Sequence, residues 1–323
     1  MRNNAWFWAF VASLLAMMLY TTNTKNAAQR QVRVVQTDTL KKTVDTSKKS
    51  KSKSQSSSSQ KEPKEPNVKS IIYSNKFETA KGSNKSLINT IKRVMGQENS
   101  YQVQVNDLKK SKVFAGISNN SKSQQVDKIF EFYMLAALYQ QEKSGKITAS
   151  TAIKVKSSDM VKGDKLVTKG IAYGPSYLRS QMLKGSRSAA NALLGEIGRE
   201  NVNSIAKSLG ATNTQMTSNF SKSISGKTTA KDLATVMSNL YKGKVLGRSY
   251  SQTMLKAIAK NTTYPQTKLT SSLSGTIYEM GDDSSAVALI EKDNHTYAIS
   301  VWADKTKQFN NLGRAVNTWM MAN

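Results

Sequence analysis

Residues 125–139, QVDKIFEFYMLAALY, are the stretch that decides the fold. This stretch is apolar, rich in helix formers and free of Gly and Pro, and a polar stop at residues 140–145 follows it. These features predict a buried central helix that needs neighbours on most of its sides. Its first turn carries Lys128 beside Asp127, where the helix emerges from the core. Two interpretations of this amine stay open here: a catalytic base, or a solvated lysine at a helix start.

The composition excludes several kinds of site. The 323 residues include no cysteine, so the chain has no disulfide framework, no thiolate nucleophile and no Cys-ligated metal. The single histidine, His295, excludes His-cluster metal sites and a Ser-His-Asp triad that needs a second helper histidine. We therefore expect neither a metal nor a cofactor. The formal net charge of +27 favours an anionic environment, which can be nucleic acid, anionic lipid or a polyanionic cell wall.

The N-terminal residues have the pattern of an export segment. A short flank, residues 1–4, carries Arg2 and precedes the uncharged apolar run AWFWAFVASLLAMMLY. One positive residue before such a run is typical of a signal peptide or a signal anchor, which we place at residues 5–22. Lys25 or Asn26 stands where a cleavage site needs a small residue, so an uncleaved anchor is favoured. The chain is then expected on the extracellular face of the cell membrane, or secreted if the segment is cleaved.

Residues 23–67 form a polar segment rich in Lys and Ser, with KKTVDTSKKSKSKSQSSSSQKEPKEP as its central part. Such a composition buries too little apolar surface to offset the entropy of ordering, so it predicts a disordered linker. Its lysines can bind anionic polymers, but a soluble spacer that repels itself is the favoured interpretation. Nucleic acid is not expected as a partner, because an exported, membrane-anchored chain rarely meets it.

From residue 68 onward the pattern is globular, and we expect one domain over residues 68–323. Alternation predicts a hairpin of strands at residues 101–105 and 112–117. Further helices are expected at residues 83–95, 177–183, 189–197, 202–209, 229–241 and 308–321, and further strands at residues 273–278, 286–290 and 296–302. Strands at both ends of a helical block predict an α+β fold, with an antiparallel sheet built from both chain ends.

Five stretches of this domain follow one another in an informative order. They are YQVQVNDLKKSKVFAGISNN, KIFEFYMLAALYQQEKSGKIT, YLRSQMLKGSRSAANALLGEIG, and the pair GKTTAKDLATVMSNLYKGKVL and LSGTIYEMGDDSSAVALI. This order resembles the class A β-lactamase and penicillin-recognising serine hydrolase family: opening strands, nucleophile helix, second motif, then a later helix and the third-motif strand. The resemblance covers about residues 98–323. It implies a β-lactamase-like (serine D,D-peptidase/transpeptidase-like) fold with a helical subdomain.

The chemistry of that family needs three motifs, and this sequence departs from each. The first is S-x-x-K, a serine one helical turn before a lysine that takes its proton. Lys128 matches the lysine, but Gln125 stands at the nucleophile position. The second motif, S-D-N, is Ser186-Arg187-Ser188 here, and the third, K-T-G, is Leu273-Ser274-Gly275. The loop at residues 213–226 also lacks the glutamate that class A enzymes place there to activate water.

The residues that survive define a degenerate site. Lys128 and Ser186 are its candidate catalytic residues, and Ser186 is expected to hydrogen-bond Lys128 across the cleft. The candidate binding residues are Ser188, Ser274 and Gly275. Without a nucleophile the covalent step cannot take place. The resemblance therefore implies a catalytically inactive domain with a hydrolase fold.

These expectations combine into one functional hypothesis with rivals. The favoured hypothesis is a membrane-anchored, extracellular β-lactamase-like protein that acts as a binding or scaffolding module on peptidoglycan or anionic wall polymer. The alternative is an active serine hydrolase of β-lactams or stem peptides with a displaced nucleophile such as Ser121, Ser123 or Ser186. Ser204-x-x-Lys207 fits S-x-x-K, but inside a later helix, in a chain rich in Ser and Lys. A third hypothesis makes the basic surface itself the function, through teichoic acid or anionic lipid.

Overall fold

The structure is a computed structural model that describes residues 76–97, 99–110, 113–221, 224–304 and 308–323. These residues belong to one compact unit, Asn67–Asn323. The expected signal anchor at residues 5–22, the expected linker at residues 23–67 and the start of the expected domain lie outside the described residues. Within the part of the chain that is described, no helix is both long and apolar enough to cross a bilayer.

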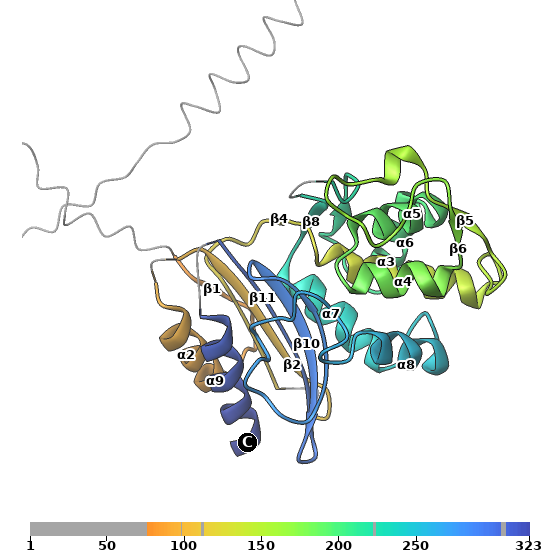
Figure 1. The fold of residues 1–323 in the computed structure, drawn as a ribbon. Coiled ribbons are helices and arrows are strands. Elements are labelled where there is room, and N and C mark those ends of the chain that lie inside the picture. The colour runs from red at the N-terminus through yellow and green to blue at the C-terminus, as the bar shows by residue number, and fades with distance from the viewer. Residues whose placement is uncertain (1–75, 98, 111–112, 222–223, 305–307) are drawn as a thin grey trace, which may run out of the picture. The chain divides into compact units, whose positions relative to one another are not determined.

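The main sheet is antiparallel and joins the two ends of the domain (Figure 1). Its strand order is β1-β3-β2-β11-β10-β9. The strands are β1 (Glu78–Thr79), β2 (Tyr101–Asp107), β3 (Phe114–Ser118), β9 (Thr276–Gly281), β10 (Ser285–Lys292) and β11 (His295–Ala303). The N-terminal hairpin meets the C-terminal meander where β2 pairs with β11, with Val105 opposite Ile299. This arrangement confirms the predicted α+β fold with a sheet built from both chain ends.

Helices cover both faces of this sheet (Figure 1). The helices α2 (Lys85–Met95) and α9 (Phe309–Ala322) lie side by side on one face, where Trp319 Nε1 donates a 3.1 Å hydrogen bond to Ser86 Oγ. Apolar residues that alternate along β2, β10 and β11 fill the core beneath them. On the other face, α7 (Ala230–Tyr241) packs across β2, β10 and β11 and connects the sheet to the helical subdomain.

The helical subdomain is built around α3 (Phe130–Lys143), which is buried on all sides. Its surrounding elements are η2 (Ser157–Asp159), α4 (Pro175–Leu183), α5 (Arg187–Ile197), α6 (Arg199–Ser208) and α8 (Arg248–Ala257). Two small sheets complete it: β5 (Ile153–Lys154) with β6 (Ala172–Tyr173), and β4 (Gln124–Val126) with β8 (Gly226–Thr228) and β7 (Gln215–Met216). The apolar run of residues 130–139 explains the central place of α3, because it offers no polar face to solvent.

Three expectations from the sequence need correction. The central helix begins at Phe130, not at residue 125, because Gln125 lies in β4 and pairs with Lys227 of β8. Strand β9 begins at Thr276, so Leu273, Ser274 and Gly275 precede the strand instead of lying on it. The helix α8 was not expected, since its sequence RSYSQTMLKA has few apolar residues and only Ser251, Met254 and Leu255 are buried.

Candidate functional site

The first turn of α3 carries a buried ion pair. Lys128 Nζ donates a 2.8 Å hydrogen bond to Glu131 Oε2, and the two side chains are 10% and 3% exposed. The chain leaves β4 and turns at residues 127–129, where the Glu131 N–H donates to the Lys128 carbonyl at 3.0 Å. Lys128 therefore lies just before α3, one turn away from Glu131 in the first turn of the helix. A single buried charge without a partner would cost free energy of desolvation. The ion pair reduces this cost for both Lys128 and Glu131.

Glu131 titrates unusually because of this position. Burial raises the pKa of the Glu131 carboxyl to about 7, against the opposing effect of the Lys128 ammonium, which favours the charged form. The nearby Asp127 carboxylate adds to the increase. The net charge of the pair therefore changes close to neutral pH, because the Glu131 carboxyl gains or loses its proton there.

A second ion pair adjoins the first at the same junction. Arg187 Nη2, from the first residue of α5, lies 2.5 Å from Asp127 Oδ2. The other oxygen of Asp127 accepts a hydrogen bond from the Ser225 hydroxyl, which is fully buried just before β8. The Ser225 backbone N–H also donates to the Val126 carbonyl over 2.9 Å. Asp127 thus ties the start of α3 to α5 and to the β4–β8 sheet.

The start of α5 has its own closed network. Ser186 is the N-cap residue, and its hydroxyl accepts from the Ala189 N–H at 3.0 Å while donating to Asp164 Oδ2 at 2.8 Å. Asp164 Oδ2 also accepts from the Ser188 N–H at 2.8 Å. Burial would raise the pKa of Asp164, but these donated hydrogen bonds outweigh it and hold the pKa below its ordinary value. The carboxylate lies at the helix N-terminus, where negative charge is favoured.

No cation site accompanies these carboxylates within the described ranges. Groups of three or more His, Asp or Glu side chains that could hold a metal ion are absent there. Asp127 and Glu131 each face a basic side chain instead.

Comparison with known proteins identifies the family. The sequence matches the protein family described as the beta-lactamase enzyme family over residues 86–319. The chain belongs to this family. A search of curated proteins found no match to the sequence.

Several solved structures have the same fold as this chain. The structure of PBP-A has a TM-score of 0.66 at 14% identity, covering 75% of this chain and 98% of that one. The beta-lactamase from Sphaerobacter thermophilus has a TM-score of 0.64 at 12% identity, covering 73% and 97%. The beta lactamase from Burkholderia vietnamiensis has a TM-score of 0.61 at 17% identity, covering 73% and 96%. Identities this low show a shared fold alone.

The family's S-x-x-K spacing falls on different residues than the sequence indicated. Gln125 cannot stand one helical turn before Lys128, because it belongs to a strand. The pair with that spacing across the start of α3 is Lys128 and Glu131. If this spacing corresponds to the S-x-x-K motif, Lys128 stands at the serine position of the motif. Glu131 then stands at its lysine position. Among the described residues no serine hydroxyl hydrogen-bonds the Lys128 amine, whose partner is Glu131 rather than Ser186.

The expected binding residues lie at two separate places. Ser188 is fully buried, and its hydroxyl accepts from the Val161 N–H at 2.9 Å, which holds the loop before α4 against α5. Ser274 lies just before β9, and its hydroxyl accepts from Lys292 Nζ at 2.9 Å. Gly275 has a φ of +116°, and a Cβ there would come 2.6 Å from the Glu291 carbonyl oxygen. The glycine is therefore explained by close backbone approach.

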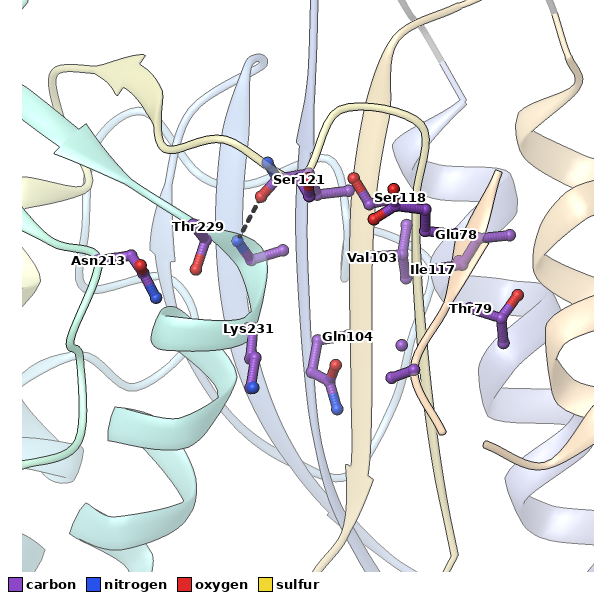
Figure 2. Close-up of a pocket in the computed structure, with 14 residues that line it drawn as sticks. Glu78, Thr79, Val103, Gln104, Ile117, Ser118, Ser121, Asn213, Thr229 and Lys231 are labelled. Carbon is purple, nitrogen blue, oxygen red and sulfur yellow. Dashed lines mark hydrogen bonds between the residues drawn. The ribbon is translucent and has the colours of Figure 1, made fainter. Parts of the chain in front are cut away.

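The other candidate serines also lie apart from the first turn of α3. Ser123 Oγ donates to the Asn213 carbonyl at 2.7 Å, and Ser204 and Lys207 lie on α6. Ser121 lines a pocket of about 330 Å³ over β2 and β3, beside the N-terminus of α7 (Figure 2). Lys231 extends into the same view next to Gln104, but no hydrogen bond joins Ser121 to a base among the residues described.

The sequence pattern predicts Lys128 as a site residue but not its partner Glu131. Glu131 was absorbed into the apolar run, although a lone glutamate inside a buried helix signals a paired charge. The Lys-x-x-Glu spacing at the helix start was the available signal. Asp127, Arg187 and Ser225 come together only through tertiary contacts, which no local pattern reveals.

Proposed function

We propose that this chain is a membrane-anchored, extracellular β-lactamase-like protein without acylation chemistry, which serves as a binding or scaffolding module at the cell wall. The observation that carries the proposal is the Lys128–Glu131 ion pair at the first turn of α3. An active member of the family needs a serine and its lysine base at this turn. Here the same positions hold two charged groups that satisfy each other.

Neither member of the pair can replace the missing nucleophile. The Lys128 amine donates to Glu131 Oε2, and its side chain is only 10% exposed, so it is not presented to a substrate carbonyl. The Glu131 carboxylate is almost completely buried, so a substrate cannot reach it. Ser225 is bound to this network, but it is 0% exposed and its hydroxyl donates a hydrogen bond to Asp127. Loss of the attacking group lowers the rate by several powers of ten.

The proposed location and partner rest on the sequence. The apolar run within residues 5–22 supports an anchor, and the Lys- and Ser-rich residues 23–67 support a spacer between membrane and domain. A formal net charge of +27 supports an anionic partner such as wall polymer. The anchor, the spacer and the charge would all serve a binding protein that has no catalytic activity.

Reaction with a fluorescent penicillin tests the proposal. The full-length chain, purified in detergent, is incubated with the reagent and run on a denaturing gel beside an active penicillin-binding protein. A cooperative unfolding transition confirms that the sample is folded. We expect no covalent fluorescence on this chain. A stoichiometric adduct would overturn the proposal and favour a displaced nucleophile, which Ser121→Ala, Ser123→Ala and Ser186→Ala variants would then locate.

A further inference from the structure

The pocket over β2 and β3 has a polar floor between β1 and the start of α7 (Figure 2). Its volume of about 330 Å³ falls in the range of roughly 300–1,000 Å³ that small-molecule sites have. The floor is Gln104 of β2 and Gly116 of β3, which lie opposite each other in the sheet. None of the described residues that line this β2–β3 pocket belongs to the first turn of α3, so the pocket is separate from the Lys128–Glu131 pair.

A chain of hydrogen bonds fixes the direction of the Gln104 amide. The Ser238 hydroxyl donates to the Ala234 carbonyl oxygen at 2.6 Å, so it accepts from Asn106 Nδ2 at 3.2 Å. Asn106 Oδ1 then accepts from Gln104 Nε2 at 2.7 Å. Because the carbonyl at the end of the chain can only accept, every donor in the chain points toward α7. The Gln104 carbonyl oxygen, Oε1, is therefore the end of the amide that is left for the pocket.

This oxygen is a buried acceptor without a donor. Gln104 is only 9% exposed, and among the described residues none donates a hydrogen bond to its Oε1. Oε1 lies over Gly116, where an added Cβ would come 2.5 Å from it. A buried carbonyl oxygen that lacks a donor costs free energy. The floor of the β2–β3 pocket therefore favours a ligand that presents an N–H or O–H group.

The α7 side of the pocket favours negative charge. Thr229 caps α7, and its hydroxyl oxygen accepts from the Asp232 N–H at 3.0 Å, which leaves the hydroxyl proton for another acceptor. Lys231 in the first turn of α7 is exposed and has no ion pair within the described ranges. Both residues line the pocket at the positive end of the helix dipole. A carboxylate placed there would accept from the hydroxyl and from the ammonium group.

The β1 side of the pocket carries the opposite charge. Glu78 is exposed, lines the pocket and has no ion pair in the described part of the chain. Since β1 pairs with β3 while α7 packs on β2, Glu78 and Lys231 lie on opposite sides of Gln104 (Figure 2). The acidic Asp232 does not alter this arrangement, because it is buried and accepts from the Asn213 N–H at 2.7 Å.

We propose that the β2–β3 pocket binds a small zwitterion of the amino acid or short peptide class. The carboxylate of the ligand accepts from Lys231 and Thr229, an N–H group donates to Gln104 Oε1, and the ammonium group faces Glu78. A fully ionised anion such as sulfate offers no donor to Gln104, and a simple amine leaves Lys231 unpaired. This inference goes beyond the proposed function and does not depend on it, because the pocket uses none of the residues that argue for lost acylation chemistry.

Equilibrium dialysis with radiolabelled glycylglycine tests the proposal. This dipeptide is a small molecule that carries an ammonium group, an amide N–H and a carboxylate. We expect saturable binding of one equivalent to the full-length chain in detergent. N-acetylglycylglycine lacks the ammonium group and glycylglycinamide lacks the carboxylate, so each should compete about tenfold more weakly than unlabelled glycylglycine. Absence of saturable binding, or equal competition by all three compounds, would overturn the proposal.

A substitution at the floor locates the bound dipeptide. Gly116→Ala places a methyl group against Gln104 Oε1, at a glycine whose φ is not positive. We expect it to weaken binding by about tenfold or more, because the methyl group covers the acceptor. Gly195→Ala is the matched control, since a Cβ there has no atom within 4 Å. A urea unfolding transition like that of wild type shows that the Gly116→Ala variant is folded.

A substitution at the rim gives a second arm that does not disturb the core. Lys231→Gln removes the exposed ammonium group and should weaken binding about tenfold. Lys227→Gln, at an exposed position of β8 that does not line this pocket, should leave binding unchanged. Binding that survives both Gly116→Ala and Lys231→Gln would place the dipeptide elsewhere and overturn the proposal. The reaction with penicillin is unaffected by either result, so the two proposals fail separately.

Discussion

At the scale of single residues, the Lys128–Glu131 pair is the main feature at the start of α3. A buried pair offers little net stability over an apolar replacement, because the attraction mostly offsets the cost of desolvation. The high pKa of Glu131 reports the same balance, since burial outweighs the neighbouring ammonium. The pair is therefore not explained by a gain in stability, which agrees with the proposed loss of acylation chemistry.

The pH dependence of stability follows from this glutamate. Burial raises the pKa of Glu131 from an ordinary 4.5 to about 7, so between these values the folded protein keeps a proton that the unfolded chain has released. The contribution is fully present below pH 4.5 and is lost as pH rises to about 7. Glu131→Gln cannot titrate. We expect wild type to lose about 3 kcal/mol relative to Glu131→Gln between pH 4 and pH 8 in urea unfolding.

The matched control for this prediction is Glu196→Gln, an exposed glutamate on α5. Its difference from wild type should change little with pH. A Glu131→Gln difference that is constant with pH, or that grows in favour of wild type as pH rises, would contradict the account of the pair.

At the scale of elements, the hydroxyls of Ser186 and Ser188 hold the start of helix α5 against the loop that precedes α4. Ser186 caps α5 and binds Asp164, so the residue that would relay a proton in the family acts here as a structural hydrogen-bonding group. Asp164 in turn places a negative charge at the start of α5. The loop and the helix are thus joined through one carboxylate.

Removal of the Ser186 hydroxyl tests that structural role. Ser186→Ala loses an N-cap hydrogen bond and leaves Asp164 with one donor fewer, so we expect a loss of about 2 kcal/mol in the free energy of unfolding. The measurement is the urea midpoint at unchanged m. Ser180→Ala, at an exposed position of α4, is the control. A urea midpoint of Ser186→Ala equal to that of Ser180→Ala would contradict the proposed role of Ser186 as the N-cap of α5.

The sequence predicted elements well where local pattern decides them. The β2–β3 hairpin, the central helix and the C-terminal meander follow from alternation and apolar runs. The start of the helix was wrong because Gln125 pairs with Lys227, about a hundred residues away, and no local signal reports that contact. Leu273-Ser274-Gly275 looked like a motif on a strand, yet its glycine is explained by the approach of the Glu291 carbonyl. Of the Lys128–Glu131 pair, the sequence predicted Lys128 alone.

At the scale of the whole molecule, positive charge is the dominant property. The formal net charge is +27, and only a few of the described basic side chains are in ion pairs. Interactions of exposed charges are screened beyond about 8–10 Å at physiological salt, so binding driven by them is sensitive to ionic strength. If the protein binds the cell wall through its charge, the binding should weaken as the salt concentration rises.

Sedimentation with purified cell wall tests the wall-binding proposal. We expect the full-length chain to bind at low salt, to be released at high salt and to bind several-fold less after deletion of residues 23–67. Wall stripped of its anionic polymer should retain less of the intact chain. Binding that survives the deletion and ignores ionic strength would argue against charge as the basis of the interaction.

The most direct test of the central claim, an acylation site lost to an ion pair, is the intact mass of the protein after exposure to penicillin. The full-length chain is incubated with excess antibiotic, denatured and weighed by mass spectrometry beside an active penicillin-binding protein treated identically. The account predicts an unchanged mass for this chain and a mass increased by one penicillin for the comparator. A stoichiometric mass increase on this chain would contradict it.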